Sequence, residues 1–208
     1  AVPGGGRIPS CRQNTAYSDV GNLGMSVRTL GALVEKFGLH GQQLGEVAMG
    51  AVIKHSSDWN LGREATLSSG LSPLTPGITL QRACGTSLDS IITAGNKIAL
   101  GQIEAGIGGG SDTTSDVPIV YGQALRRRLL AGAGAKTPKD KLSAFRGFAF
   151  GELKPDFPGV AEPRTGKSMG EHCEDMARQW NIARDSQDEL ASASHHKLAA
   201  AYERGFFD

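Results

Sequence analysis

The first half of the chain carries apolar residues at the spacing of amphipathic helices. Residues 24–37 place them on one face, and Gly38 is a natural stop after them. A short helix is predicted at 61–69, with Asn60 as its N-cap. A third helix is predicted over residues 88–100. The apolar face of this third helix comprises Ile91, Ile92, Gly95, Ile98 and Ala99.

Apolar runs without helical spacing alternate with these helices and predict β-strands. Residues 47–53 are nearly all apolar, as expected of a strand that is covered on both faces. Shorter runs at 77–80 and 103–107 predict two more strands. Strands that alternate with helices indicate βαβ units and a parallel, doubly covered sheet, so the predicted fold class is α/β. In such sheets, functional sites lie at the carboxyl ends of the strands.

The second half of the chain follows a different pattern. Residues 113–166 have no clean strand pattern and are rich in Pro, Gly and basic residues. They include a short basic helix at 123–130 and a cluster of phenylalanines within 142–157. Two further helices are predicted at 169–179 and 184–203. The second half is therefore expected to be mostly helical.

Composition narrows the classes of protein and partner. With 208 residues, 39% of them apolar, the chain can bury a substantial core. A formal net charge of +1 gives no strong attraction to nucleic acid, so no nucleic-acid partner is expected. No apolar run is long enough to span a membrane, and no signal segment opens the sequence. A cytoplasmic location is expected, or a mitochondrial one in a eukaryote.

Cysteines and histidines give no indication of a metal site. The three cysteines, Cys11, Cys84 and Cys173, are widely spaced and form no CxxC pair. This spacing argues against a zinc site and a disulfide framework, and it favours a reducing compartment. The neighbouring histidines His195 and His196 also lack metal-ligand spacing. No bound metal is therefore expected.

Cys84 stands where the strand at 77–80 gives way to the helix at 88–100. Backbone N–H groups of a first helical turn lack partners, and Thr86 and Ser87 supply small polar side chains there. The positive end of the helix dipole favours the thiolate, which is the nucleophilic form of cysteine. Cys84 is therefore a candidate nucleophile. The alternative is a small buried apolar residue at a strand–helix junction.

Two other patterns have simple structural explanations. Residues 106–111 resemble a phosphate-binding loop, but Ser111 stands in place of the third glycine of G-x-G-x-x-G and no helix is predicted after it, so a tight backbone crossing is favoured. The arginine run at 126–128 is followed by Lys136, Lys139 and Lys141. Most such basic runs are solvated faces, and this interpretation is preferred to a phosphate or membrane role.

Several short motifs, taken in order along the chain, resemble those of one family. Gly-Gly-Gly-Ser-Asp at 108–112 stands where that family has Gly-Gly-x-Glu or Asp. Ser-Met-Gly-Glu at 168–171 and the Gln-Asp and Ser-His pairs within 187–195 also match. Together with the stretch around Cys84, they make the chain similar to the N-terminal part of the thiolases. Ser-Asp-Val-Pro-Ile at 115–119 most resembles the β-subunit branch of fatty-acid-oxidation complexes.

The resemblance implies a layered thiolase-like α/β core over residues 1–113 and part of an inserted, mostly helical loop domain over 114–208. It also implies acyl transfer to or from coenzyme A, as in acetyl-CoA acetyltransferases and 3-ketoacyl-CoA thiolases. Cys84 would attack the substrate carbonyl and hold the acyl group as a thioester. A Gly108–Gly110 turn would pass close beneath the Cys84 loop and near a dimer interface. Met169 and Ser168 would lie near the pantetheine of coenzyme A.

The chain differs from the usual thiolase motifs at three positions and lacks two of them. The family usually has Asn, Ser and Gly where this chain has Gln81, Thr86 and Ser87. The Gly-His-Pro and Cys-x-Gly motifs, which supply the catalytic base and a second cysteine, belong to a C-terminal half that follows. The chain is therefore expected to be truncated and inactive alone.

Expected partners are an acyl-CoA substrate and no permanently bound cofactor. The complete protein is expected to be a homodimer or homotetramer, with a fatty-acid-oxidation α-subunit as a further candidate partner. Two alternative functions stay open from the sequence. One is a condensing enzyme of the 3-ketoacyl synthase type, and the other is a non-catalytic interaction module.

Overall fold

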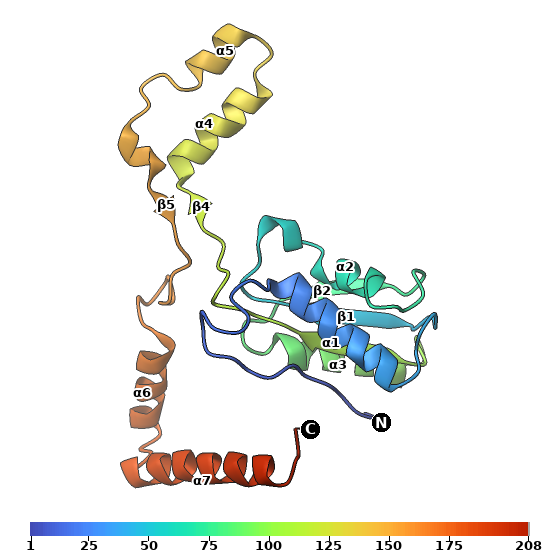
Figure 1. Ribbon diagram of the computed structural model, residues 1–208. Helices are drawn as coiled ribbons and strands as arrows, with labels where there is room; N and C mark the ends of the chain where they lie inside the picture. The colour runs from blue at the N-terminus through green and yellow to red at the C-terminus, as the bar shows by residue number, and fades with distance from the viewer. Residues whose placement is uncertain (208) are drawn as a thin grey trace. The chain divides into compact units, whose positions relative to one another are not determined.

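A computed structural model describes residues 1–207 and divides the chain into two compact units. The first unit comprises residues 1–158 and the second begins at Gly159. The first unit holds a parallel sheet, the helices that cover it and a helical hairpin (Figure 1). The division into domains at 113 and 114, which follows from the thiolase resemblance, stays a prediction.

Three short parallel strands form the sheet of the first unit. They are β1 (Glu46–Gly50), β2 (Gly77–Leu80) and β3 (Gly106–Gly110), in the order β2-β1-β3. All five residues of the central strand β1 are buried, as its apolar sequence predicts. The predicted α/β class with a parallel sheet is therefore confirmed.

Helices cover both faces of this sheet. Helix α1 (Asn22–Lys36) and helix α2 (Leu61–Leu67) pack on each other, and together with Val47 and Met49 of β1 they form the main core. The core residues are Leu30, Val34, Val47, Met49, Ala65 and Leu71. Helix α3 (Thr86–Ala99) packs on β3 and β1 instead (Figure 1). Because side chains alternate along a strand, Ala48, which lies between Val47 and Met49, faces α3.

Helix α3 presents its small residues to the sheet. Thr86, Ser90 and Ala94, spaced four apart, are buried, and the Ser90 hydroxyl donates to the carbonyl of Thr86 at 2.9 Å. The large apolar residues that the sequence places on one face are exposed instead. Ile91 is 44% exposed and Ile92 is 48% exposed.

The glycines of β3 explain this orientation. A Cβ added at Gly108 would lie 2.5 Å from the backbone nitrogen of Ile91 in α3. Helix and strand therefore touch backbone to backbone, and the helix face at this contact has room only for small side chains. The pattern of apolar residues identified the helix correctly, but it did not show which face is buried.

Two strand boundaries differ from the sequence prediction. Strand β3 runs over Gly106–Gly110 and not over 103–107, because its glycines pair in register with β1 although they carry no side chains for a hydrophobic pattern. Strand β1 ends at Gly50, although the apolar run continues to 53. The backbone N–H groups of Val52 and Ile53 donate to the Asp112 carboxylate instead of to a neighbouring strand.

The second half of the first unit contains a helical hairpin, residues 120–156, here called the basic hairpin. It comprises β4 (Val120–Tyr121), α4 (Gln123–Gly134), α5 (Pro138–Ser143), the 3-10 helix η2 (Phe150–Leu153) and β5 (Pro155–Asp156). The strands β4 and β5 pair antiparallel at its base (Figure 1). Helix α4 packs on α5 and η2. The predicted basic helix is thus four residues longer than expected, and two short strands not predicted from the sequence close the hairpin.

Arg128 holds the basic hairpin together. Its Nε donates to Glu152 at 2.6 Å, and its other guanidinium nitrogens donate to the carbonyls of Ala144, Arg146 and Gly147. Both side chains of the ion pair are mostly shielded from solvent. The hydrogen bond from Arg128 lowers the pKa of Glu152. One residue of the basic run is therefore structural.

The second unit contains two helices, α6 (Met169–Gln179) and α7 (Arg184–Glu203), with the predicted bounds. A capping box starts α6, because the Ser168 hydroxyl accepts from the backbone of Glu171 and the Glu171 carboxylate accepts from the backbone of Ser168. Within residues 1–207, no helix has the length and apolar character needed to cross a membrane.

The close contact between α3 and β3 predicts that adding one methyl group at Gly108 lowers the stability of the fold. Gly108→Ala is expected to lower the free energy of unfolding by about 3 kcal/mol, because the new Cβ overlaps helix backbone that cannot rotate away. Gly95→Ala, on α3 with no atom within 4 Å of the new Cβ, should raise it by up to about 1 kcal/mol. Urea unfolding of both variants measures the difference, and a similar change in both would contradict the tight contact.

Candidate functional site

Cys84 lies in a tight turn between β2 and α3, and its side chain is exposed. The interpretation as a buried apolar residue is therefore wrong. Ala83, immediately before it, has a φ of 41°, in the left-handed region that residues other than glycine seldom occupy. Gly85 follows as the N-cap of α3, and its N–H donates to the carbonyl of Arg82 at 2.9 Å. The thiol thus stands at the positive end of a helix, as predicted.

Thr86 fixes the shape of this turn. Its hydroxyl accepts from the backbone N–H of Arg82 at 2.8 Å and donates to the carbonyl of Ala83 at 2.7 Å. The sequence predicts that Thr86 serves the free N–H groups of the first helical turn. The structure places its hydroxyl on the preceding residues instead, because Thr86 is already the first helical residue and is buried against the sheet.

Two charged residues brace the outside of the turn. Lys54, which follows β1 in sequence, donates from Nζ to the side-chain oxygen of Gln81 at 2.6 Å and also to the carbonyl of Ala51. Arg82 pairs with Asp89 of α3 at 3.1 Å, but its side chain is 73% exposed, so water screens most of this attraction. Sequence analysis missed Lys54, since a lone lysine thirty residues before the cysteine carries no motif.

The carboxyl ends of all three strands meet beneath the turn. A Cβ at Gly50, the last residue of β1, would lie 2.0 Å from the carbonyl oxygen of Leu80 in β2. A Cβ at Gly110, the last residue of β3, would lie 2.9 Å from the Ser87 hydroxyl. Residues 108–110 form a strand and not the predicted turn, and they pass close to the first turns of α3 at Ser87 and Ile91. Their position near a dimer interface stays a prediction.

Residues 111 and 112 tie the end of β3 to the neighbouring loops. The Asp112 carboxylate accepts three hydrogen bonds of 2.8–2.9 Å from the backbone of Val52 and Ile53. The Ser111 hydroxyl donates to the carbonyl of Asn22 at 3.0 Å and bonds the Ser26 hydroxyl at 2.7 Å. These groups are occupied by the protein itself, which agrees with a backbone crossing and not with a phosphate-binding loop.

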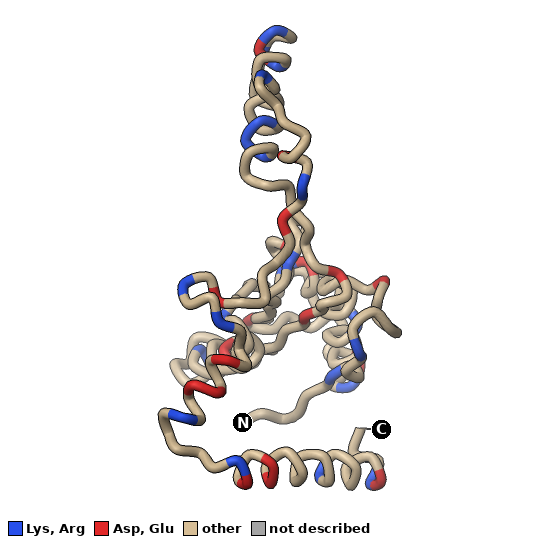
Figure 2. Tube along the Cα trace, turned by 90° about the vertical axis from the view of Figure 1, so that its left-hand side faces the viewer, with Lys and Arg blue, Asp and Glu red and all other residues tan. Residues whose placement is uncertain are grey.

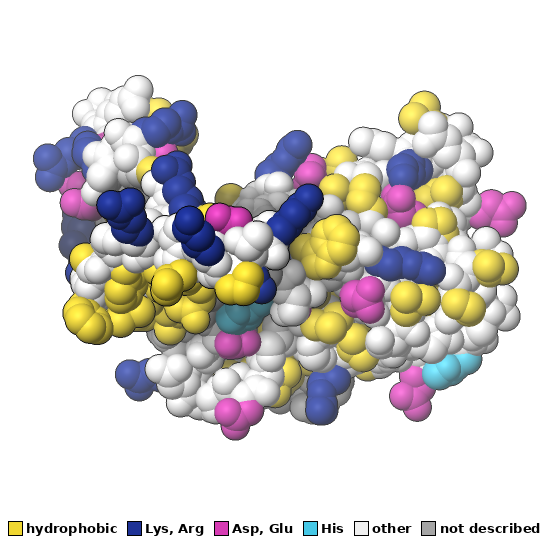
Figure 3. Space-filling model, turned by 90° about the horizontal axis from the view of Figure 1, so that it is seen from above, with side chains coloured by type: hydrophobic (Ala, Val, Ile, Leu, Met, Phe, Trp, Pro, Cys, Tyr) yellow, Lys and Arg dark blue, Asp and Glu magenta, His cyan; other side chains and the backbone are white. Residues whose placement is uncertain are grey.

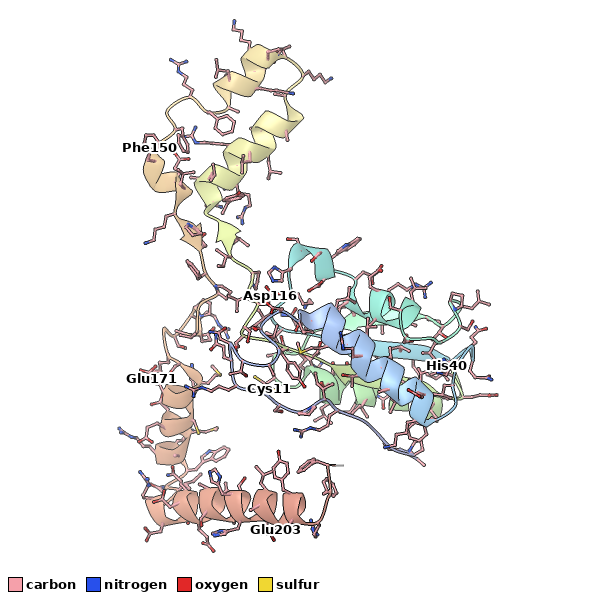
Figure 4. The ribbon with its side chains drawn as sticks, viewed as in Figure 1. Cys11, His40, Asp116, Phe150, Glu171 and Glu203 are labelled. Carbon is pink, nitrogen blue, oxygen red and sulfur yellow. The ribbon has the colours of Figure 1, made fainter. Side chains whose placement is uncertain are left out.

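The two residues predicted to contact coenzyme A belong to the second unit. Ser168 is the N-cap of α6, and its hydroxyl is engaged with Glu171, labelled in Figure 4. Met169 is the first residue of α6 and is 62% exposed. Cys84 lies in the first unit, whereas Ser168 and Met169 lie in the second. The contacts of Ser168 and Met169 with coenzyme A stay predictions. Among the residues described, no cluster of His, Cys, Asp and Glu is arranged to hold a metal ion.

The Thr86 hydrogen bonds predict a loss of stability when the hydroxyl is removed. Thr86→Val keeps the shape but leaves two backbone groups without their partner, so the free energy of unfolding should fall by about 2 kcal/mol. The Arg82 amide should also exchange its hydrogen faster. Thr93→Val on the same helix removes a hydroxyl that makes no hydrogen bond within residues 1–207, and its effect should be small. Equal effects of the two substitutions would rule out the bracing role of Thr86.

The capping box predicts that the start of α6 depends on pH. Hydrogen bonds from the backbone and side chain of Ser168 lower the pKa of Glu171. Because the pKa of Glu171 is lower in the folded state, its ionised carboxylate stabilises the helix at pH values above the pKa of an ordinary glutamate. This stabilisation is lost as the pH falls through the pKa of the folded state. The Cα chemical shifts of residues 169–171 should therefore move towards coil values on acidification. Glu171→Gln should abolish this dependence, whereas Glu189→Gln on α7 should leave it unchanged.

Comparison with known proteins gives the family. The model of the thiolase N-terminal domain matches residues 1–208. The 3-ketoacyl-CoA thiolase of Photorhabdus laumondii is 35% identical over 205 residues, which cover 99% of this chain and 47% of that protein. The 3-ketoacyl-CoA thiolase of Pectobacterium carotovorum is 36% identical over the same length.

The fold agrees with this assignment. The crystal structure of the Bacillus anthracis acetyl-CoA acetyltransferase superposes with a TM-score of 0.73 and 25% identity, over 94% of this chain and 45% of that chain. The chain thus spans about half the length of the relatives it matches. The chain belongs to the thiolase family, of which it represents the N-terminal domain.

Proposed function

We propose that this chain supplies the nucleophile half of a thiolase that transfers acyl groups to or from coenzyme A through a thioester on Cys84. The observation that carries the proposal is the exposed thiol at the start of α3, in a turn braced by Thr86 and by the ends of three strands. The match to 3-ketoacyl-CoA thiolases over nearly the whole chain supports the reaction class.

The chemistry of thiolytic cleavage assigns a task to each group. The Cys84 thiolate adds to the 3-keto carbonyl, and the carbon–carbon bond to the acetyl-CoA portion breaks. The released carbanion takes up a proton, and the acyl group stays on Cys84 as a thioester. The thiolate of a second coenzyme A then attacks this thioester, and the Cys84 sulfur leaves as a thiolate. The backbone N–H of Cys84, at the helix start, would help to bind the oxyanion.

The proposal extends to groups beyond Cys84. Met169 and Ser168 would contact the pantetheine of coenzyme A, which acts as a substrate and not as a permanently bound cofactor. The proton donor and acceptor would come from the second half of the complete thiolase, so this chain alone would be inactive or nearly so. A dimer or tetramer and a fatty-acid-oxidation α-subunit belong to the same proposal, as does a cytoplasmic or mitochondrial location.

Acyl transfer to Cys84 can be measured directly. We expect incubation with acetyl-CoA, followed by intact-mass and peptide mass spectrometry, to show acetylation of Cys84 in a complete polypeptide that includes the second half. The 208-residue chain alone should show little. Cys11 and Cys173 are also exposed and serve as internal controls for non-specific acylation.

Each result separates the possibilities. Equal acetylation of the chain alone would mean that the helix start activates Cys84 without the second half, and the expected inactivity would be wrong. Acetylation of all three cysteines, or of none in the complete polypeptide, would reject Cys84 as the nucleophile. Transfer only from an acyl-carrier protein would favour a condensing enzyme instead of a thiolase.

A further inference from the structure

The loop that follows strand β1, residues 51–55, is fixed at the carboxyl edge of the sheet. Its backbone N–H groups at positions 52 and 53 donate to the Asp112 carboxylate at 2.8–2.9 Å. The His55 ring contacts the Asp116 carboxylate at 3.0 Å. Both acidic residues come from the segment that follows β3. The loop therefore presents Lys54 from a fixed position beside the Cys84 turn.

Lys54 binds this turn with an ammonium group that has only neutral partners. Its Nζ donates to the side-chain oxygen of Gln81 at 2.6 Å and to the carbonyl of Ala51. Within residues 1–207 this ammonium group makes no other hydrogen bond and no ion pair. The carboxylates of Asp112 and Asp116 are directed to other donors. Lys54 is half-buried, so water hydrates its charge only in part.

The other cation at the turn is balanced by an acidic residue. Arg82 pairs with Asp89 of α3 at 3.1 Å. Figure 2 shows basic and acidic positions interspersed along the chain, and Figure 3 shows side chains of both signs on one face of the molecule. With a net charge of +1, the chain has no general positive field. Positive charge at the turn therefore depends on Lys54.

A brace alone does not require this charge. A neutral amide could donate to the same two oxygens without the cost of removing an ammonium group from water. Functional sites lie at the carboxyl ends of parallel strands, and Gln81 stands three residues before Cys84. The Cys84 thiol is exposed, so the field of a nearby cation acts on reactants that approach it from solvent.

We propose that Lys54 is a positioning residue for Cys84. Through Gln81 it holds the entrance of the turn, and its ammonium group places a positive charge where anionic reactants approach the thiol. The inference rests on the proposed acyl transfer, in which the incoming coenzyme A thiolate is such a reactant.

Alkylation of the 208-residue chain by two related reagents tests the proposal. The cysteine sulfur displaces iodide from both reagents, but iodoacetamide is neutral and iodoacetate is an anion. The ratio of their rates at Cys84 therefore reports the charge near the thiol and not the reactivity of the thiol itself. Lys54→Met should lower the ratio of the iodoacetate rate to the iodoacetamide rate about threefold at low salt. The difference should vanish at about 1 M salt, where the Debye length is about 3 Å.

A second variant tests the role of Gln81. Gln81→Leu keeps the net charge but removes the acceptor that holds Nζ, so the ratio should fall to a similar extent. The double variant should show no larger fall than either single variant, because both remove the same held charge. Lys54→Arg keeps a cation that can donate to both oxygens, and it should retain the ratio of the unaltered chain.

Matched controls separate a local charge from the net charge. Arg28→Met removes one positive charge from an exposed position on α1 and should leave the ratio at Cys84 unchanged. Cys11 and Cys173 are exposed and are measured in the same digest, and their ratios should be the same in every variant. Circular dichroism of each variant confirms folding.

Three outcomes would overturn the proposal. An unchanged ratio in Lys54→Met would reject the charge, and an unchanged ratio in Gln81→Leu would reject the positioning through Gln81. An equal loss in Arg28→Met would assign the effect to net charge.

The assay contains no acyl donor, so its failure is distinct from failure of the proposed function. Acetylation of Cys84 in the complete polypeptide, together with an unchanged ratio in Lys54→Met, would reject the role of Lys54 and leave acyl transfer intact. A lowered ratio without acetylation would support the placed charge and reject its use in acyl transfer.

Discussion

The close contact between helix α3 and the glycine strand β3 is the constraint on which the first unit depends. With Gly108 beneath it, the helix backbone lies almost directly on the strand. This contact selects small residues, Ser90 and Ala94, for the buried face and leaves the larger apolar side chains outside. A helix normally buries its leucines and isoleucines, so backbone proximity here decides the orientation in place of hydrophobic burial.

The candidate site inherits its geometry from that contact. The Cys84 turn has few stabilising interactions of its own, and Ala83 occupies a region of backbone space that costs about 1–2 kcal/mol. The cost is offset by the Thr86 hydroxyl, whose position depends on α3 lying against the sheet, and by Lys54 from the loop after β1. The placement of the thiol is therefore a property of the folded core and not of the seven residues around it.

Sequence patterns predicted those parts of the structure that depend on local or repeated signals. The bounds of α6 and α7, the parallel sheet and the position of Cys84 at the start of a helix all follow from periodicity and capping residues. Strand β3 was misplaced because glycines carry no hydrophobic signal, and the buried face of α3 was missed for the same reason. The roles of Lys54 and Asp112 depend on contacts across 27 and 60 residues, which no short motif records.

The arginine run shows how helical geometry assigns different roles to identical neighbours. Three successive arginines on α4 look equivalent in sequence, and a solvated face is the simplest interpretation. The helix turns Arg128 towards Glu152 and the carbonyls of the loop after α5, where its planar group donates to both oxygens of the carboxylate and to three carbonyls. Because this anchor neutralises one carboxylate and orders the hairpin, Arg126, Arg127 and the exposed Leu130 one turn further along α4 are held in a fixed arrangement.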